Sequence, residues 1–373
     1  MFRRLSVILG LKPSEPGKRS APAESEWKIN ERKENYKATL SQALTIFDEK
    51  YNEACNNENG VPSKNIEEFK IYGLLRSGIY RPVLQAKYIP DSTRCALKVM
   101  NKGEVAKDGR QENVIEEKRI LQSLSHPFIV DLLYTGQDFA NVYLMTELAP
   151  YGTLAKRGKG QHEEIIKHFI AQIVLALEYL NTVNVIFRNL RPSNILLFED
   201  GRVKLGDFHL AKLCREKRGT ICGDCRYRAP ECYIKKGGKI EYGLEVDWWG
   251  LGVLLHELLT GNVPYPGIED RELMSDICQK PYIPPEDIDE VTQDFLTKLL
   301  EKDPDKRLGH MKDDQTDVKD HPYFEDVIFV HVLYLVKGYR LPKMSMAKVE
   351  DYDKKKIFPE VIKDEYRGIY KEF

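Results

Sequence analysis

The pattern of apolar and polar residues divides the chain into segments of different structure. Between residues 36 and 51, apolar side chains recur every three or four positions, which predicts an amphipathic helix. Between about 69 and 145, short runs rich in β-formers (CALKVM, NVYLMT) surround one helical stretch, VIEEKRILQSL. Beyond residue 150 the pattern is mainly helical, and VDWWGLGVLLHELLTG is almost entirely apolar. We therefore expect a small sheet-based lobe and a larger helical lobe, which meet near residues 147–150.

Composition and charge narrow the class of protein. A chain of 373 residues, 42% of them hydrophobic, is longer than one hydrophobic core usually spans. The net charge of −1 offers no general attraction to nucleic acid, and the lack of an apolar run of 18 residues predicts no stable membrane insertion. The segment MFRRLSVILGLK lacks the features of a secretory signal, and a basic arm is favoured there over a mitochondrial leader. We expect a cytoplasmic protein, with the nucleus as a second location.

Seven cysteines, an odd number, favour free thiols in a reducing compartment. Cys222 and Cys225 form a C-x-x-C pair, which Cys214 and Cys232 flank. A zinc site and a redox pair are the two alternatives to ordinary loop thiols, and ordinary thiols are the favoured interpretation.

Five segments carry residues suited to phosphoryl transfer. They are ALKVM, which contains Lys98, and FRNLRPSNIL, KLGDFHLAK, RAPE and DWWGLG at 187–196, 204–212, 228–231 and 247–252. Phosphoryl transfer requires positive charge on the phosphates, carboxylate or amide ligands for magnesium, and a group that orients the attacking hydroxyl. A single lysine in a strand would not indicate phosphoryl transfer, but the five segments in this order do.

These segments resemble, in the same order, the motifs of protein kinases. Over residues 34–373 the chain resembles the AGC group, and within it most closely the catalytic subunits of cAMP-dependent protein kinase. KNIEEFKIYG, EEKRILQSLSHPFIV, GTICG, MKDDQTDVKDHPYF and the final YKEF carry this closer resemblance. It implies an α+β, two-lobed protein kinase fold with a β-rich small lobe containing the family's C helix, an α-helical large lobe and an AGC-type C-terminal tail.

The hydrophobic pattern and the resemblance together give the expected boundaries. They are a disordered arm at 1–33, an amphipathic N-terminal helix and linker at 34–60, the small lobe at 61–147, the large lobe at 148–326 and the tail at 327–373. The arm is rich in Ser, Pro, Lys and Glu and lacks periodic apolar positions. By resemblance, Tyr370 and Phe373 would anchor the tail to the small lobe.

The resemblance implies ATP and Mg²⁺ as cofactors. Lys98 would bind the phosphates, aligned by an ion pair with Glu117. Asp207 and Asn194 would bind magnesium through a carboxylate and an amide oxygen. The other implied nucleotide-binding residues are Gly78, Val83, Ala96, Glu147 and Leu196.

Further positions would regulate or brace the molecule. Thr220 corresponds to the activation-loop phosphorylation site of an upstream kinase, and Arg188 and Lys212 to the basic partners of its phosphate. By the same resemblance, Glu257 would contribute to substrate recognition, and Glu231 and Arg307 would form an ion pair within the large lobe.

The sequence departs from the family at the catalytic base. Asn189 stands where the family has the aspartate that accepts the proton of the substrate hydroxyl, and an amide is no general base near neutral pH. General-base assistance is typically worth about 10²- to 10⁴-fold, so we expect phosphoryl transfer to be impaired rather than abolished.

The Gly-rich loop is altered as well. Arg76 and Arg81 replace glycines that let backbone amides approach the phosphates, and Pro82 follows them. The arginines could add charge near the triphosphate, but we favour the interpretation that their bulk stiffens or lifts the loop and weakens ATP binding. His209, in place of a glycine after Phe208, reduces the freedom of the activation segment.

One substitution coincides with the loss of the catalytic aspartate. Asp224 takes the place of a threonine that in the family bonds to the catalytic loop. We predict that Asp224 pairs with Arg191. The carboxylate is then either a substitute proton acceptor or, as we favour, part of a salt bridge that locks an inactive loop.

Substrate recognition is also depleted. Thr153 and Ser193 replace two of the three carboxylates that select arginines in the substrate, and Arg228 replaces an apolar residue in the pocket for the residue after the target serine. We expect little preference for basic peptides. In the arm, Ser6 lies in RRLSV, which matches a target site or a pseudosubstrate of the active kinase.

These features support competing functions. The first is a Ser/Thr protein kinase relative that binds ATP and Mg²⁺ and phosphorylates a protein substrate weakly. The alternative is a pseudokinase that acts as a scaffold or competes for kinase regulatory subunits, and a fully active kinase is least favoured. Val349 and DKKK at 353–356 replace the family's adenine-contacting Phe and an acidic run, which weakens the case for nucleotide affinity and for regulatory-subunit docking alike.

Overall fold

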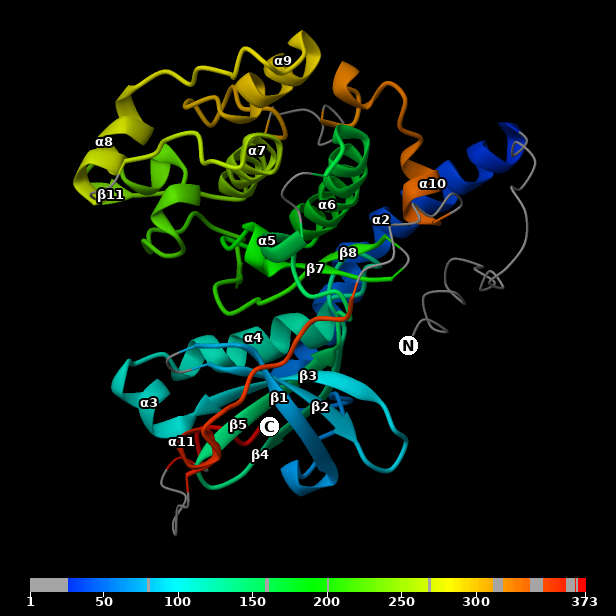
Figure 1. The fold of residues 1–373 in the computed structure, drawn as a ribbon, viewed down its shortest axis with the longest axis vertical. Helices are drawn as coiled ribbons and strands as arrows, with labels where there is room; N and C mark the ends of the chain where they lie inside the picture. The colour runs from blue at the N-terminus through cyan, green and yellow to red at the C-terminus, as the bar shows by residue number, and fades with distance from the viewer. Residues whose placement is uncertain are drawn as a thin grey trace.

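The computed structural model describes residues 26–78, 81–157, 161–199, 201–267, 270–310, 318–335, 345–359, 366 and 368–373. These residues form the two lobes that the hydrophobic pattern predicted, a sheet-rich lobe and a helical lobe (Figure 1). Residues 1–25, which include Ser6, lie outside the described part of the chain, as do residues 79 and 80 of the Gly-rich loop.

The small lobe is built on a five-stranded antiparallel sheet in the order β1-β2-β3-β5-β4. Its strands are β1 (Phe69–Arg76), β2 (Val83–Tyr88), β3 (Arg94–Asn101), β4 (Leu132–Gln137) and β5 (Asn141–Glu147). In β2 every second side chain is buried, as expected for a strand with one face on the core. The helices α3 (Lys102–Lys107) and α4 (Gln111–Ser123) follow β3, and α4 packs between the sheet and the large lobe (Figure 1).

The large lobe surrounds α6 (Glu163–Thr182), most of whose residues are buried. The helix α7 (Glu245–Thr260) packs against both α6 and α9 (Glu290–Leu299), and α8 (Asp270–Gln279) lies farther from α6 (Figure 1). The loops that face the small lobe are held by short elements. These are α5 (Leu154–Arg157) and the strand pairs β6 (Val185–Ile186) with β9 (Lys212–Leu213) and β7 (Ile195–Leu197) with β8 (Val203–Leu205). A further pair, β10 (Lys235–Lys236) with β11 (Lys239–Ile240), lies near α8 (Figure 1).

The N-terminal helix, α2 (Glu26–Cys55), is longer than the sequence predicted. Its apolar side chains Ala43, Phe47 and Ala54 are buried, and the helix lies along both α4 and α6. The predicted arm at 1–33 therefore ends too late, because α2 begins at Glu26. The segment EWKINERK has no apolar stripe, but most of its residues favour helix. Helix propensity therefore extends α2 ahead of the residues that pack on the core.

The C-terminal segment joins the two lobes. The helix α10 (Phe329–Leu333) packs on α6 and α2, and the chain from residue 345 then runs towards the small lobe, shown from orange to red in Figure 1. Glu350 pairs with Leu74 of β1 through two backbone hydrogen bonds of 2.7 and 2.8 Å. After α11 (Lys354–Ile357), Phe358 packs on the small-lobe core. The tail that the resemblance implied is therefore present.

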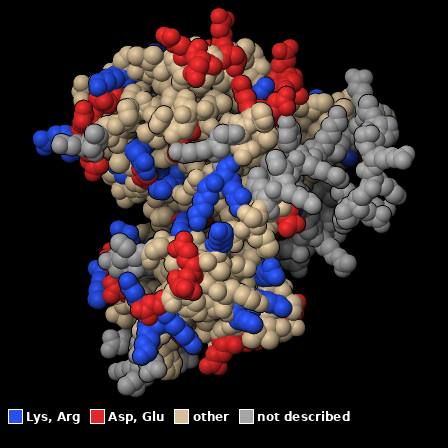
Figure 2. Space-filling view, viewed as in Figure 1, with Lys and Arg blue, Asp and Glu red and all other residues tan. Residues whose placement is uncertain are grey.

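The surface shows no field of one sign on the face in Figure 2, where acidic and basic side chains are interspersed. This distribution agrees with the net charge of −1. Among the described residues, no helix is long and apolar enough to cross a membrane.

Candidate active site

A cavity of about 550 Å³ lies between the lobes. Ligand pockets for small molecules typically have volumes of about 300–1,000 Å³, so its size fits a nucleotide. Nearly all the residues expected at a nucleotide site line it: Val83, Ala96, Lys98, Glu117, Glu147, Leu196, Asn194 and Asp207. Gly78 is the exception, because it does not line the cavity.

A chain of charged contacts crosses this cavity. Lys98, on β3, places its Nζ 2.6 Å from Oε1 of Glu117 on α4 and 2.7 Å from Oδ1 of Asp207. The Lys98 and Glu117 side chains are 9% and 1% exposed, so the pair is shielded from water. The ion pair that the sequence predicted is present, and it directs the lysine ammonium into the cavity.

Asp207 follows β8 and adopts a left-handed backbone conformation, with φ of 62°. Both of its carboxylate oxygens are engaged: Oδ1 by Lys98 and by Nδ1 of His209 at 2.9 Å, and Oδ2 by Nη2 of Arg76 at 2.7 Å. Burial alone would raise the pKa of this carboxyl, but Lys98, His209 and Arg76 together hold it well below its usual range. Asp207 is therefore an anion surrounded by donors.

Arg76, the last residue of β1, makes the contact that sequence reasoning missed. Its guanidinium reaches across the cleft and donates from Nη2 to Asp207 and from Nη1 to Oδ1 of Asn194, at 3.2 Å. The sequence identified an arginine at a glycine position, but not which way the side chain would turn. One indication of this contact was present in the sequence, a basic residue at the end of a strand that borders the cavity.

Magnesium does not fit this arrangement as it stands. The Asp207 and Asn194 oxygens expected to bind it already accept hydrogen bonds from Arg76. Because Mg²⁺ demands near-octahedral oxygen coordination, the guanidinium would have to leave before the ion could bind both residues. The cavity itself fits a nucleotide, since its lining combines apolar side chains with Lys98.

Asn189 lies beside Asp207 and Asn194 and is buried, with 8% exposure. Its Nδ2 donates to the backbone oxygen of Asp207 at 3.0 Å, and its own backbone oxygen accepts from Nδ2 of Asn194 at 2.8 Å. The amide therefore braces the loop that carries Asp207. It cannot take a proton near neutral pH.

The comparisons with known proteins agree with this geometry. The model of the protein kinase domain matches residues 69–324. This chain belongs to the protein kinase family. Its relatives include "cAMP-dependent protein kinase catalytic subunit PRKX" of Mus musculus, 34% identical over 70% of this chain and 74% of the mouse protein. "cAMP-dependent protein kinase type 3" of Saccharomyces cerevisiae is 30% identical over 83% of this chain and 79% of the yeast protein.

Other relatives are longer than the region they share with this kinase domain. "cAMP-dependent protein kinase, catalytic subunit-like" of Caenorhabditis briggsae is 35% identical over 64% of this chain, which covers 62% of the nematode protein. The match to the Dictyostelium discoideum catalytic subunit covers 49% of that protein. The resemblance to AGC kinases of the cAMP-dependent type is thus confirmed.

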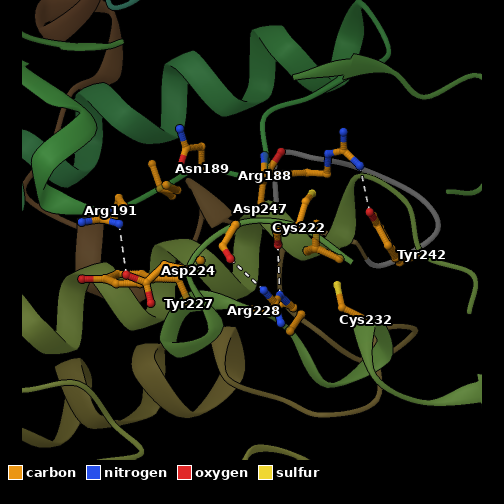
Figure 3. A pocket seen from close by; sticks show the side chains of 15 residues that line it. Arg188, Asn189, Arg191, Cys222, Asp224, Tyr227, Arg228, Cys232, Tyr242 and Asp247 are labelled. Carbon is orange, nitrogen blue, oxygen red and sulfur yellow. Dashed lines mark hydrogen bonds and ion pairs between the residues drawn. The ribbon is translucent and has the colours of Figure 1, made fainter. Parts of the chain in front are cut away.

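The kinase's second pocket lies under the activation segment (Figure 3). There, Nη1 of Arg191 lies 3.0 Å from Oδ2 of Asp224, which is the pair that the sequence predicted. Arg226 also binds Asp224, through Nη2 at 2.7 Å and Nε at 3.0 Å. Burial would raise the pKa of the Asp224 carboxyl, but the hydrogen bonds from Arg226 and the charges of both arginines lower it. A carboxylate held in this way is a poor proton acceptor.

Arg228, which also lines this pocket, turns its guanidinium to the backbone (Figure 3). It donates to the oxygens of Cys222 at 3.0 Å and Gly223 at 2.7 Å. The pocket that resembles the binding site for the residue after the target serine is therefore lined by a cation where the family has an apolar side chain. Nearby, Glu257 accepts a hydrogen bond from the Tyr227 hydroxyl.

The expected phosphorylation site, Thr220, is exposed. Arg188 donates to the Leu210 oxygen and, at 2.9 Å, to the Tyr242 hydroxyl, which in turn donates to the Thr220 oxygen. Arg188 is thus linked to the phosphosite through Tyr242. Lys212 is half-buried, and burial lowers the pKa of its ammonium.

Two expected bracing contacts are present. Arg307 and Glu231 form a buried bidentate pair, with N–O distances of 2.6 and 2.9 Å. In the tail, Tyr370 and Phe373 are buried against the small lobe, and the Phe373 oxygen accepts from Oγ of Ser63 at 2.8 Å.

The tail also lines the nucleotide cavity, through residues that the sequence did not predict. Ser345, Ala347, Lys348 and Glu350 contribute to the lining, whereas Val349, at the position of the family's adenine-contacting Phe, does not. The Ala347 amide holds this stretch by donating to the Pro150 oxygen at 2.7 Å.

The seven cysteines are all free thiols. Within the described residues, no group of three or more His, Cys, Asp or Glu side chains could hold a metal ion. Ordinary thiols at Cys222 and Cys225 stay a prediction of the sequence.

Proposed function

We propose that this protein binds ATP between its lobes and retains weak transfer of phosphate to Ser or Thr of a protein substrate. The observation that supports this most directly is the contact chain from Glu117 through Lys98 to Asp207 at one end of a nucleotide-sized cavity. Lys98 would bind the phosphates, and the apolar lining would bind the base. When bound, ATP supplies the phosphoryl group for transfer.

Two features make the proposed transfer weak. Asn189 offers an amide where a carboxylate would assist the hydroxyl nucleophile, which forfeits about 10²- to 10⁴-fold. Arg76 holds the two residues expected to bind the metal. The remaining contribution of the protein is positioning, which accounts for much of catalysis in phosphoryl transfer.

A second candidate function is that of a pseudokinase, and Arg76 is the observation that favours it. In this case the nucleotide stabilises a scaffold that binds a regulatory subunit of cAMP-dependent kinases or competes for one. The partly exposed pair of Asp224 with Arg191 and the buried pair of Glu231 with Arg307 keep the large lobe ordered for such a role. An upstream kinase acting on the exposed Thr220 would order the activation segment further.

The test uses the purified full chain. ATP binding is measured by titration calorimetry, and phosphate transfer by incorporation of labelled phosphate into a mixed Ser/Thr peptide library. Lys98→Ala should lose nucleotide affinity, and Asp207→Ala should lose transfer. Binding with slow, Asp207-dependent transfer supports the impaired kinase, and binding without transfer supports the pseudokinase. A protein that binds no ATP under any condition would contradict both.

A further inference from the structure

Arg76 occupies the position that a divalent cation would need. It projects from the end of β1 over the cavity and contacts Oδ1 of Asn194 at 3.2 Å and Oδ2 of Asp207 at 2.7 Å. Those are the two side chains whose oxygens would be metal ligands by resemblance. A single positive group therefore bridges both.

The chemistry of the guanidinium suits this position. It keeps its positive charge at every physiological pH, and its N–H groups match the oxygens of carboxylates and phosphates. The two contacts above use one N–H of each terminal nitrogen, and further N–H groups remain on the guanidinium. The Arg76 side chain is 36% exposed and lines the cavity, so those groups can reach a ligand there.

The local charges disfavour a second cation on Asp207. Lys98 and Arg76 are balanced by Glu117 and Asp207, so these four side chains together carry no net charge. A divalent cation would meet two cations on the same carboxylate. A phosphate group, in contrast, would accept hydrogen bonds from two cationic side chains within one cavity, and such charge-assisted bonds are stronger than neutral ones.

We propose that the Arg76 guanidinium takes the place of the divalent cation, so that this site binds nucleoside di- and triphosphates without Mg²⁺. The inference rests on the proposed nucleotide-binding function and deepens it. Arg76 connects Asp207 and Asn194 to the phosphates in the way a metal ion does in an active kinase.

Arg81 provides a matched control in the same loop. It is also an arginine at a glycine position, but it does not line the cavity. Its charge acts instead on Tyr370, where burial raises the pKa of the phenol to about 12 and Arg81 opposes the rise. Restoring glycine at 81 therefore changes loop freedom without removing the cation from the metal position.

The experiment compares ATP affinity in excess EDTA and in excess Mg²⁺ by calorimetry. For the wild type we expect ATP to bind at least as tightly in EDTA as in Mg²⁺, because Mg²⁺ in solution competes with Arg76 for the phosphates. For Arg76→Gly we expect binding that depends on Mg²⁺ and weakens at least about tenfold in EDTA. Arg81→Gly should show the same dependence on Mg²⁺ as the wild type, because Arg76 is still in place. Arg76→Gln, which keeps a polar side chain but is shorter and uncharged, serves if Arg76→Gly does not fold.

A second readout needs no nucleotide turnover. Electron paramagnetic resonance of Mn²⁺ should show no nucleotide-dependent site in the wild type and a new one in Arg76→Gly. If the wild type binds ATP only with Mg²⁺, or if Arg76→Gly keeps the wild-type pattern, the inference is overturned while the proposed nucleotide binding stands. If the wild type binds ATP in neither condition, both fail together.

Discussion

Asn189 donates a hydrogen bond from Nδ2 to the backbone oxygen of Asp207 over 3.0 Å. The residue in the position of the catalytic base is thereby tied to the loop of the expected metal ligand. The donor is an amide, so the contact is one that a carboxylate at this position could not make. At position 189 the proton acceptor is therefore lost, and a hydrogen bond that braces the Asp207 loop is gained.

The first prediction concerns this residue. In the Arg76→Gly background, which frees the metal ligands, Asn189→Asp should raise the Mg²⁺-dependent rate of peptide phosphorylation by about 10²-fold or more, because a carboxylate restores general-base assistance. Initial rates with labelled ATP measure it. Asn189→Ala in the same background is the control and should give no gain. An unchanged rate for the aspartate variant would show that transfer is limited elsewhere.

Pairs of opposite charge were predictable from the sequence, and the direction of a long side chain was not. The Lys98–Glu117, Arg191–Asp224 and Arg307–Glu231 contacts are all present, since each follows from a motif whose geometry the fold fixes. Arg76 is different, because it stands where the motif has no side chain at all. Its guanidinium could turn to the phosphates, to solvent or across the cleft, and only the packed structure decides.

At both ends of the chain, the sequence predicted only part of the structure. The start of α2 at Glu26 was missed because the two apolar residues near its start, Trp27 and Ile29, form no apolar stripe. The burial of Tyr370 and Phe373 was expected from the terminal motif. The contribution of Ser345 and Ala347 to the cavity lining was not expected. These small side chains match no binding motif, and they lie at the cavity because of the path that the tail takes.

The second prediction separates the two roles considered for Asp224. Its carboxylate accepts from Arg191 and Arg226, so Asp224→Ala should lower the free energy of unfolding by about 1–2 kcal/mol. If the pair locks the loop, residual transfer should stay the same or rise. Denaturant titration and peptide phosphorylation measure the two effects. Asp224→Asn, which keeps an acceptor oxygen, should lose less stability. A loss of transfer without a loss of stability would instead identify Asp224 as a proton acceptor.

The third prediction concerns the anchoring of the tail. Tyr370 is fully buried, and its backbone oxygen accepts from Nε2 of Gln137 at 2.9 Å. Tyr370→Ala should lower the free energy of unfolding by about 3 kcal/mol, as for other truncations of buried aromatic residues. Amide exchange in α4 should also increase, because the tail packs against that helix through Arg119 and Glu372. Ile369→Ala removes an exposed neighbour, 43% accessible, and should change stability by less than about 0.5 kcal/mol.

The last prediction follows from His256 on α7. The side chain is buried and its Nδ1 lies 2.9 Å from the Tyr282 hydroxyl, and burial lowers the pKa of the imidazole from 6.5 to about 4. The unfolded chain therefore binds a proton below pH 6.5 that the folded chain refuses until about pH 4. The stabilising contribution of neutral His256 is present above this window and is lost as the pH falls through it.

His256→Gln tests this linkage, because an amide oxygen can still accept from Tyr282 but does not titrate. Between pH 7 and 4.5, the variant should lose about 2 kcal/mol less stability than the wild type, as judged by denaturant titration across that range. His162→Gln, at an exposed position before α6, is the matched control and should retain the wild-type slope. Equal slopes in the wild type and His256→Gln would mean that the pKa of this imidazole is the same in the folded and unfolded chains, and would rule out the linkage.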